Sequence, residues 1–338
     1  MTPKRSIIPI FVPHLGCPHN CVFCNQRRIS GESEPATAEK TVEIIEEALS
    51  FLPRDTDKTV AFYGGSFTAV EKELQEELLG AVQPYILSGK IGDIRLSTRP
   101  DAIDEDVTAR LKRFNVRTVE LGIQSLDEEV LLLSKRGHTA QCAERAAKLV
   151  KEAGFELILQ MMTGLPGDTP QKSVATARRF CELKPDGVRI YPTVVVKDTE
   201  LFEMWRSGEY REHSVKEAVE LGADLLDIFE KAGITVVRFG LNPTEDLSGG
   251  DAAGGAYHPA LRELAENVRY LRAEKKLVSD SDRGKTLRFI VPRGRTSQAV
   301  GQKRANIEAL KGEFGIKNAV FIESDEINNP CNIRREYV

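Results

Sequence analysis

The strongest restriction on the fold of this chain is a regular alternation of short apolar runs with longer amphipathic segments. Strand-like runs lie at 6–12, 59–65, 93–100, 118–125, 155–167, 187–196 and 234–241. Segments with helical spacing of apolar residues separate most of them, and 37–52 is one example. Six or seven strand–helix units in this order predict an α/β fold, with a parallel sheet curled into a partial or full (β/α) barrel.

A smaller unit is expected after this repeat. A glycine-rich loop and a linking helix at 246–280 follow the barrel of 1–245. The remainder, 281–338, has strand-like runs at 286–292 and 318–324 with a basic helix between them at 297–311. We therefore expect a barrel domain, a connector, and a small basic α/β appendage of β-α-β type.

Charge is unevenly distributed along the chain. The net charge is −4, yet residues 283–317 hold nine Lys or Arg against two Asp or Glu. A local positive surplus can attract polyanions to the appendage. No apolar run approaches the roughly 20 residues that would span a bilayer. The N-terminal segment is too short and too interrupted by proline for an export signal. A cytoplasmic location with reduced thiols is expected.

Three of the six cysteines lie within eight residues, directly after the first strand-like run. Cys17, Cys21 and Cys24 have the spacing Cys-x-x-x-Cys-x-x-Cys. A structural zinc site needs four ligands, which His14 or His19 could complete. Alternatively, three thiolates on a four-iron cluster leave one iron open for a reactive partner. The end of a barrel strand is where such active sites form.

This cysteine motif, with Phe23 before the last cysteine, resembles the signature of the radical S-adenosylmethionine (SAM) superfamily. The resemblance implies a 4Fe-4S cluster held by Cys17, Cys21 and Cys24, and SAM bound to the fourth iron. It also implies reductive cleavage of SAM to a 5′-deoxyadenosyl radical. The protein would supply binding and positioning for this chemistry.

Segments at later strand ends also resemble the family's SAM-binding parts. "YGGSFT" resembles the glycine pair whose backbone carbonyls receive the SAM amino group, "STRPD" the ribose or carboxylate contact, and "KRGHT" a basic residue for the SAM carboxylate. The resemblance implies these cofactor-binding residues: Phe23, Tyr63, Gly64, Gly65, Ser97, Gln124 and Arg136.

Over residues 6–240 the chain is most similar to the radical SAM core of the Elongator catalytic subunit, a tRNA wobble-uridine modification family. The likeness is strong at 189–210, where Tyr191 is a candidate catalytic residue; Tyr257 and His258 are further candidates for the substrate mouth. Too few residues follow for that family's acetyltransferase domain. The resemblance implies an RNA substrate, with tRNA as the expected RNA, and an electron donor such as a flavodoxin or ferredoxin.

The basic appendage contains "AVGQKRANIEAL", which is similar to a KH-type RNA-binding turn. Gly301 matches the first glycine of that turn, and Arg304 replaces the second. Four residues are predicted to bind RNA phosphates: Arg293, Arg295, Lys303 and Arg304.

Two alternatives stay open at this point. One is a radical SAM enzyme that acts on a small molecule such as a tetrapyrrole, or on a peptide; "TGLPGDTP" resembles the oxygen-independent coproporphyrinogen oxidase branch. The other is a non-enzymatic protein with structural zinc. The remaining cysteines, Cys142, Cys181 and Cys331, are expected to be packed or idle thiols.

Overall fold

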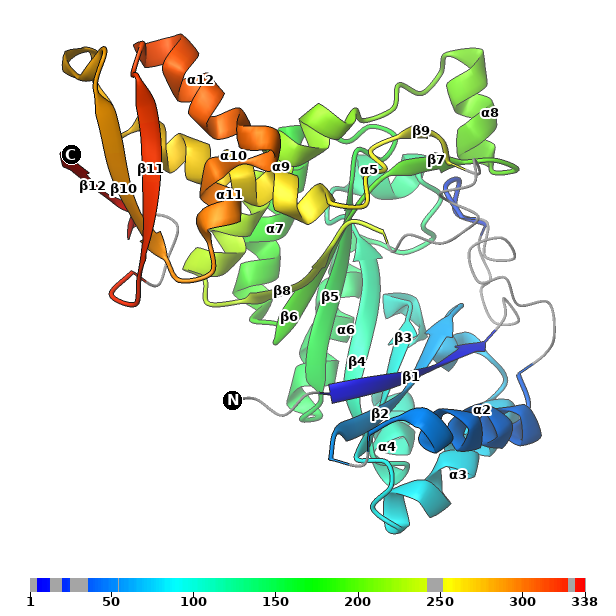
Figure 1. Cartoon of the computed structure of the whole chain (residues 1–338). Coiled ribbons are helices and arrows are strands. Elements are labelled where there is room, and N and C mark those ends of the chain that lie inside the picture. The colour runs from blue at the N-terminus through cyan, green and yellow to red at the C-terminus, as the bar shows by residue number, and fades with distance from the viewer. Residues whose placement is uncertain are drawn as a thin grey trace.

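The computed structural model describes residues 5–12, 20–24, 36–53, 55–241, 252–327 and 332–337. Seven parallel strands form one curved sheet in the order β1-β2-β3-β4-β5-β6-β8 (Figure 1). Each of the seven predicted strands is present, and the sheet is an open half-barrel, so the predicted α/β barrel class is confirmed. The strands are β1 (Arg5–Val12), β2 (Asp57–Gly64), β3 (Asp93–Thr98), β4 (Val116–Gln124), β5 (Glu156–Thr163), β6 (Gly187–Pro192) and β8 (Thr235–Phe239).

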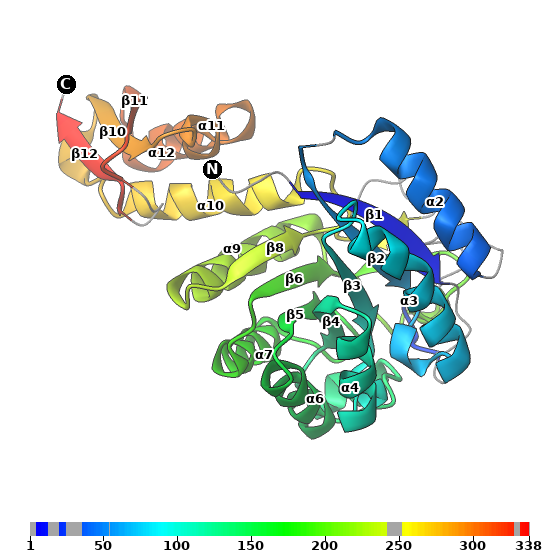
Figure 2. The same cartoon turned by 90° about the horizontal axis from the view of Figure 1, so that it is seen from below.

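Helices cover the outer face of the half-barrel (Figure 2). Side-chain caps set several of their starting points: Thr37 accepts from Lys40 N, and Asp104 accepts from Val107 N. The helices along this part of the chain are α2 (Ala38–Phe51), α3 (Lys72–Leu87), α4 (Glu105–Arg113), α5 (Glu128–Leu133), α6 (Ala140–Glu152), α7 (Pro170–Leu183), α8 (Glu200–Ser207) and α9 (Val215–Lys231). Two short 3-10 turns, η1 (Phe67–Ala69) and η2 (Pro100–Ala102), follow β2 and β3.

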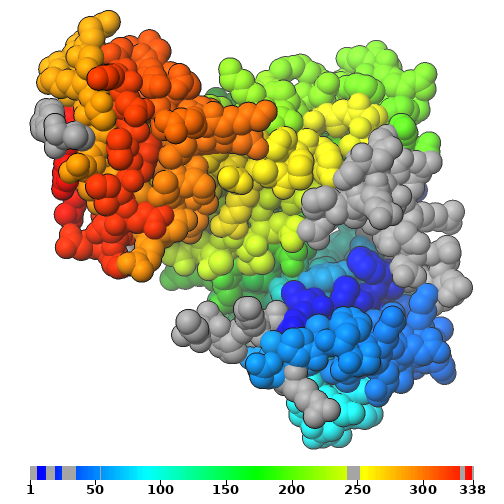
Figure 3. Space-filling model, viewed as in Figure 1, coloured from blue at the N-terminus to red at the C-terminus, as the bar shows by residue number. Residues whose placement is uncertain are grey.

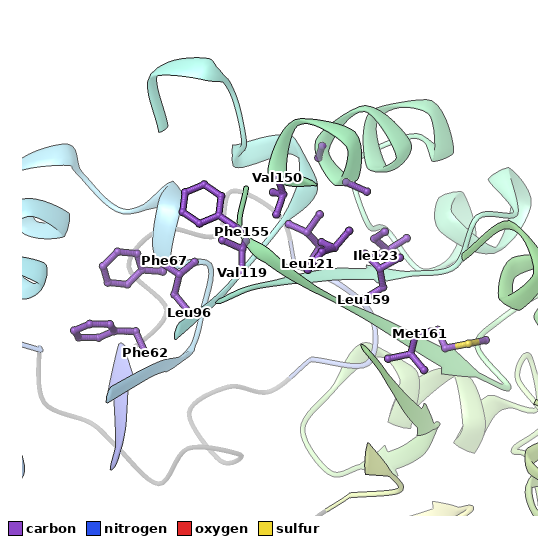
Figure 4. Packing of buried hydrophobic residues seen from close by; sticks show 14 of the residues in the cluster. Phe62, Phe67, Leu96, Val119, Leu121, Ile123, Val150, Phe155, Leu159 and Met161 are labelled. Atoms are coloured by element: carbon purple, nitrogen blue, oxygen red, sulfur yellow. The ribbon is translucent and has the colours of Figure 1, made fainter. Parts of the chain in front are cut away.

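The core lies between the sheet and these helices. Strand residues alternate between the two faces of a sheet, and Phe62, Leu96, Leu121 and Leu159 on the outer face are fully buried (Figure 4). The intervening residues point to the inner face, and several of them are polar or charged. This inner face is the surface on which the candidate site is built.

Two short strands lie at the carboxyl ends of the barrel strands, and one of them is split from the predicted run 187–196. β7 (Val194–Val196) pairs in antiparallel fashion with β9 (Ala252–Gly255), so part of the predicted glycine-rich loop is a strand. Nearby, His258 Nδ1 accepts a hydrogen bond from Ala260 N, at 3.1 Å.

The appendage is a three-stranded sheet of order β11-β10-β12, with β10 (Thr286–Pro292) parallel to β11 (Asn318–Ser324) and antiparallel to β12 (Arg334–Tyr337). The predicted single helix over 297–311 is wrong. The chain forms α11 (Thr296–Val300), the turn η5 (Gln302–Arg304) and α12 (Ala305–Phe314), because Lys303 and Arg304 both have left-handed backbone angles. The short turn η4 (Asp280–Asp282) precedes β10.

The appendage forms a lobe beside the half-barrel (Figure 3). α10 (Leu261–Lys275) joins the two, because its Leu261 packs in the barrel core and its Tyr270 in the core of the lobe. The division into 1–245, 246–280 and 281–338 stays a prediction. Within the described ranges, no helix has the length and apolar character needed to cross a membrane.

Candidate active site

The cysteine loop after β1 is described only at 20–24, so Cys17, His14 and His19 lie outside the described residues. Cys21 is buried and Cys24 is half-buried. A backbone hydrogen bond of 3.0 Å from Cys24 N to Cys21 O makes a tight turn between them. The part of the chain that the structure describes holds no cluster of three potential metal-binding side chains, and it includes two of the three predicted cluster ligands.

This turn is anchored from both sides. Val22 N donates to Ser134 O after α5, at 3.3 Å, and Val22 O accepts from Leu201 N in α8, at 2.7 Å. Phe23 packs against a small apolar cluster built on Val22, Leu201 and Tyr210. The anchors explain how a short loop can hold two thiols in a fixed position, and sequence patterns alone did not identify them.

Arg136 lies beside the first of these cysteines. Its side chain is buried, its Nη1 lies 3.1 Å from Cys21 Sγ, and its Nη2 donates to Gly122 O. Arg99 holds the same loop by donating to Arg136 O, while its guanidinium pairs with Asp101 at 2.9 Å. Arg136 thus places a positive charge in contact with one of the predicted cluster ligands. The predicted contact of Arg136 with the SAM carboxylate stays a prediction.

Gly64 ends β2 at a position that only glycine can occupy. Its φ is +108°, and a Cβ built there would lie 2.6 Å from Val12 O at the end of β1. The next residue, Gly65, donates its N–H to the same oxygen, at 3.1 Å. The glycine pair therefore brings the ends of β1 and β2 into close contact, directly before the cysteine loop.

Gln124 is the last residue of β4 and has an unusual left-handed φ of +73°. Its Oε1 is buried and has no hydrogen-bond partner in the described structure. A Cβ built at Gly122 would lie 3.2 Å from Gln124 Nε2, so this glycine leaves room for the side chain. Ser97 lies on β3, paired in register with Glu120 of β4. A strained polar residue with an unused acceptor at a strand end is typical of a binding site.

Tyr63 and Tyr191 are brought together by a residue that the sequence analysis missed. Arg189 Nη1 lies 3.2 Å from Tyr191 Oη, and its Nη2 lies 3.4 Å from Tyr63 Oη. Arg189 is in turn paired with the fully buried Glu120, at 2.9 Å. Burial and, to a smaller degree, Glu120 raise the pKa of Tyr63, so its hydroxyl is protonated at neutral pH. Arg189 and Glu120 could have been identified in the sequence because each is a charged residue within an otherwise apolar strand.

The four predicted RNA-binding residues lie in the lobe and not on the barrel strands. All four are exposed. Arg293 forms a surface ion pair with Asp325, at 2.8 Å. Within the described ranges, Arg295, Lys303 and Arg304 form no ion pair. Lys303 and Arg304 are adjacent in the turn before α12.

The fold and site together define an α/β half-barrel with a cysteine loop after its first strand and a glycine pair after its second. The family model for the radical SAM superfamily matches residues 11–180, and the radical SAM C-terminal domain model matches residues 185–272. This chain belongs to the radical SAM superfamily, whose enzymes use a 4Fe-4S cluster and SAM.

Curated relatives and solved structures agree with this assignment. A tRNA uridine(34) acetyltransferase of Methanocaldococcus infernus is 28% identical over 256 residues, covering 64% of this chain and 48% of the relative. Elongator complex protein 3 of Mus musculus is 29% identical over 241 residues, covering 65% of this chain and 43% of the relative. The chain thus spans about half the length of these proteins, or less.

The same fold occurs in solved structures. Elp3 of Methanocaldococcus infernus has a TM-score of 0.63 and 24% identity, covering 82% of this chain and 64% of that one. Coproporphyrinogen III oxidase of Escherichia coli has a TM-score of 0.50 and 18% identity, covering 68% of this chain and 53% of that one. At 24% and 18% identity, the similarity to these two structures shows a shared fold.

The residues present fit the cofactors of the family. The sulfur atoms of Cys21 and Cys24 are soft donors of the type suited to iron–sulfur ligation. Gly64 leaves backbone accessible where a side chain would collide, and Gln124 offers a buried acceptor that has no partner among the described residues. The chemistry of these residues is therefore compatible with an iron–sulfur cluster and an adenosyl cofactor at this end of the barrel.

Proposed function

We propose that this radical SAM enzyme modifies RNA and that its substrate is transfer RNA. The observation that carries the proposal is the similarity of its barrel to enzymes named tRNA uridine(34) acetyltransferase and Elongator complex protein 3. The exposed basic turn of the lobe supports it, because phosphate contacts by Lys and Arg dominate RNA affinity.

In this proposal the barrel residues keep the roles expected from their motifs. When bound, the cluster and SAM supply a radical that abstracts hydrogen from the substrate. Arg136 offsets the negative charge of the cysteine ligands. Tyr191 faces the substrate from the end of β6. The proposed cluster ligands are Cys17, Cys21 and Cys24, and the proposed SAM-positioning residues are Phe23, Tyr63, Gly64, Gly65, Ser97, Gln124 and Arg136.

In this proposal the lobe binds RNA phosphates through four basic residues: Arg293, Arg295, Lys303 and Arg304. The proposal also includes a cytoplasmic location, where tRNA is available, and a flavodoxin or ferredoxin as electron donor.

Binding of purified tRNA to the anaerobically reconstituted enzyme tests the proposal. We expect binding at low salt that weakens steeply as salt rises, by about 0.7 to 0.9 logarithmic units of affinity per tenfold salt for each phosphate contacted. Mass spectrometry of tRNA nucleosides from cells with and without the gene then identifies the modified base. Absence of tRNA binding at low salt contradicts the proposal and favours a small-molecule or peptide substrate.

A further inference from the structure

The inner face of the half-barrel carries a polar network to which five neighbouring strands contribute. Strand register brings the side chains onto one face, since Ser97 pairs with Glu120 and Gln160 pairs with Arg189. Tyr63 and Tyr191 each lie one residue before the end of their strand. The members of the network are Tyr63 of β2, Arg95 of β3, Glu120 of β4, Gln160 of β5, and Arg189 and Tyr191 of β6.

Glu120 is the centre of the network. Its side chain is 0% exposed. Its Oε1 lies 2.7 Å from Arg95 Nη2 and 3.1 Å from Arg189 Nη2. Its Oε2 lies 2.9 Å from Arg189 Nε and 3.0 Å from Gln160 Nε2. Both oxygens are thus fully used, so Glu120 fixes the two guanidinium groups and has no free acceptor for a ligand.

The network carries a surplus positive charge. Two guanidinium groups share one carboxylate, and no other acidic side chain of the described residues pairs with Arg95 or Arg189. Arg95 Nε is also buried without an acceptor in the same part of the chain. Tyr63 and Tyr191 contribute hydroxyl groups, which donate or accept hydrogen bonds, and no carboxylate. A network that only supported the sheet would be expected to balance its charges, because two buried cations that share one carboxylate are only partly compensated.

Arg189 directs this surplus toward the carboxyl end of the barrel. Its guanidinium contacts the hydroxyls of Tyr191 and Tyr63, and it lies 5.8 Å from the centroid of the Tyr63 ring. Tyr63 directly precedes Gly64, the residue predicted to meet SAM. Active sites of parallel barrels lie at this end of the strands. The paired hydroxyls therefore lie next to the predicted cofactor position.

We propose that this network is the floor of the substrate pocket. Arg189, held by Glu120 and Arg95, orients the hydroxyls of Tyr63 and Tyr191 to bind an oxygen acceptor of the substrate. The inference rests on the proposed function for its choice of substrate, in which the acceptor is a carbonyl oxygen of the target base or a backbone phosphate oxygen. The excess of donors favours uracil, with two carbonyl groups, over cytosine, whose amino group would face other donors.

The first test locates a small probe. Crystals of the cofactor-loaded enzyme are soaked with uridine, and others with inorganic phosphate. We expect one of the two to bind on Tyr63, Tyr191 or Arg189 in the wild type and to be lost in Arg189→Met. If neither uridine nor phosphate gives electron density at the network, the inference is overturned, whether or not the enzyme binds tRNA. A probe at the network in an enzyme that does not bind tRNA leaves the inference standing and contradicts the proposed function.

The second test measures affinity for three anticodon stem-loop RNAs that differ at position 34, with uridine, cytidine or no base. Arg189→Met removes the group that orients both hydroxyls, so uridine-RNA binding should weaken by about tenfold. Tyr191→Phe removes one of the two hydroxyls and should weaken binding by less. If the acceptor is the base, affinity for the abasic RNA is unchanged by these substitutions. If it is a phosphate, the affinities for all three RNAs fall together.

The control is Arg110→Met, which removes another buried arginine, one that contacts Gln75 Oε1 at 3.2 Å outside the network. It should leave RNA affinity unchanged. Iron content and SAM affinity, measured on every variant, separate a substrate role from a structural one. Equal RNA affinity in all variants, or a parallel fall of iron content and SAM affinity in Arg189→Met, overturns the inference.

Discussion

At the scale of single residues, the site depends on positions where the backbone has a positive φ, a conformation that few residue types adopt. Gly64 has φ +108° and contacts the end of β1, and Gln124 has φ +73° at the end of β4. Each is the last residue of its strand, and β2 and β4 lie on either side of β3 in the sheet. The sequence motifs identified both residues, but their backbone conformations explain why those residue types occur there.

Gly64→Ala should impair the barrel end. The added Cβ would lie 2.6 Å from Val12 O, and φ +108° is unfavourable for alanine. We expect a loss of about 1 to 3 kcal/mol in the free energy of unfolding, together with a lower SAM affinity. Thermal unfolding and equilibrium dialysis with SAM measure the two effects.

Gly80→Ala in α3 is the matched control, since nothing lies within 4 Å of its added Cβ. It should increase stability by up to about 1 kcal/mol, because alanine is a better helix former. If Gly64→Ala has the stability and SAM affinity of the wild type, the close approach of β1 and β2 is not required for folding or for SAM binding.

At the scale of elements, the turn between α11 and α12 is the most informative departure from the sequence prediction. Gly301, Lys303 and Arg304 all have positive φ, of 76°, 54° and 65°. Helical periodicity continues across the turn, so the pattern predicted one helix. The resemblance to a KH-type turn was the better guide, because it required a loop at the start of a helix.

Arg304→Gly separates the conformation of this turn from its charge. Glycine adopts a φ of +65° without strain, so stability should be unchanged or higher by up to about 1 kcal/mol. Loss of the charge should weaken tRNA binding severalfold and reduce its salt dependence by about one phosphate contact. Binding titrations at several salt concentrations measure this.

Lys184→Gly provides the matched comparison, because Lys184 is exposed, basic and left-handed with φ +50°, but lies at the end of α7 on the barrel. Its tRNA affinity should equal that of the wild type. If Arg304→Gly and Lys184→Gly bind tRNA equally well, the turn of the lobe is not an RNA contact.

At the scale of the whole molecule, α10 connects the half-barrel to the lobe. Asn306 of α12 donates to Asn267 O of α10, at 2.9 Å, and Arg269 pairs with Asp227 of α9, at 2.7 Å. The same helix also contains Glu274, which is 0% exposed and whose two carboxylate oxygens have no partner among the described residues. Burial raises the pKa of Glu274 to about 9.

Glu274 therefore makes the stability of the molecule depend on pH. Its pKa is higher in the folded state, so the folded state binds a proton more tightly and stability falls as pH rises from about 4.5 toward 9. Glu274→Gln should remove this dependence and raise the free energy of unfolding by roughly 2 to 4 kcal/mol at pH 7. Urea unfolding between pH 5 and pH 9 measures the difference.

Glu263→Gln, on an exposed position of the same helix, should leave the pH profile unchanged. Parallel profiles for wild type and Glu274→Gln would mean that the carboxyl group is solvated or paired in the folded protein.

Much of the fold follows from local sequence patterns. Periodicity and turn motifs involve residues close together in the chain, so they predicted each strand of the half-barrel. They also predicted that Cys21 follows a strand and that Gly64 and Gln124 lie at strand ends. The family could be predicted for the same reason, since its cysteine motif occupies eight residues.

Tertiary structure alone decided which distant side chains meet. Glu120 and Arg189 are 69 residues apart, and they pair because two strand registers and the curvature of the sheet bring β4 and β6 onto one inner face. The pairing of β7 with β9 has the same origin. Local patterns encode which face a residue occupies, whereas the partner across that face depends on how the strands are aligned.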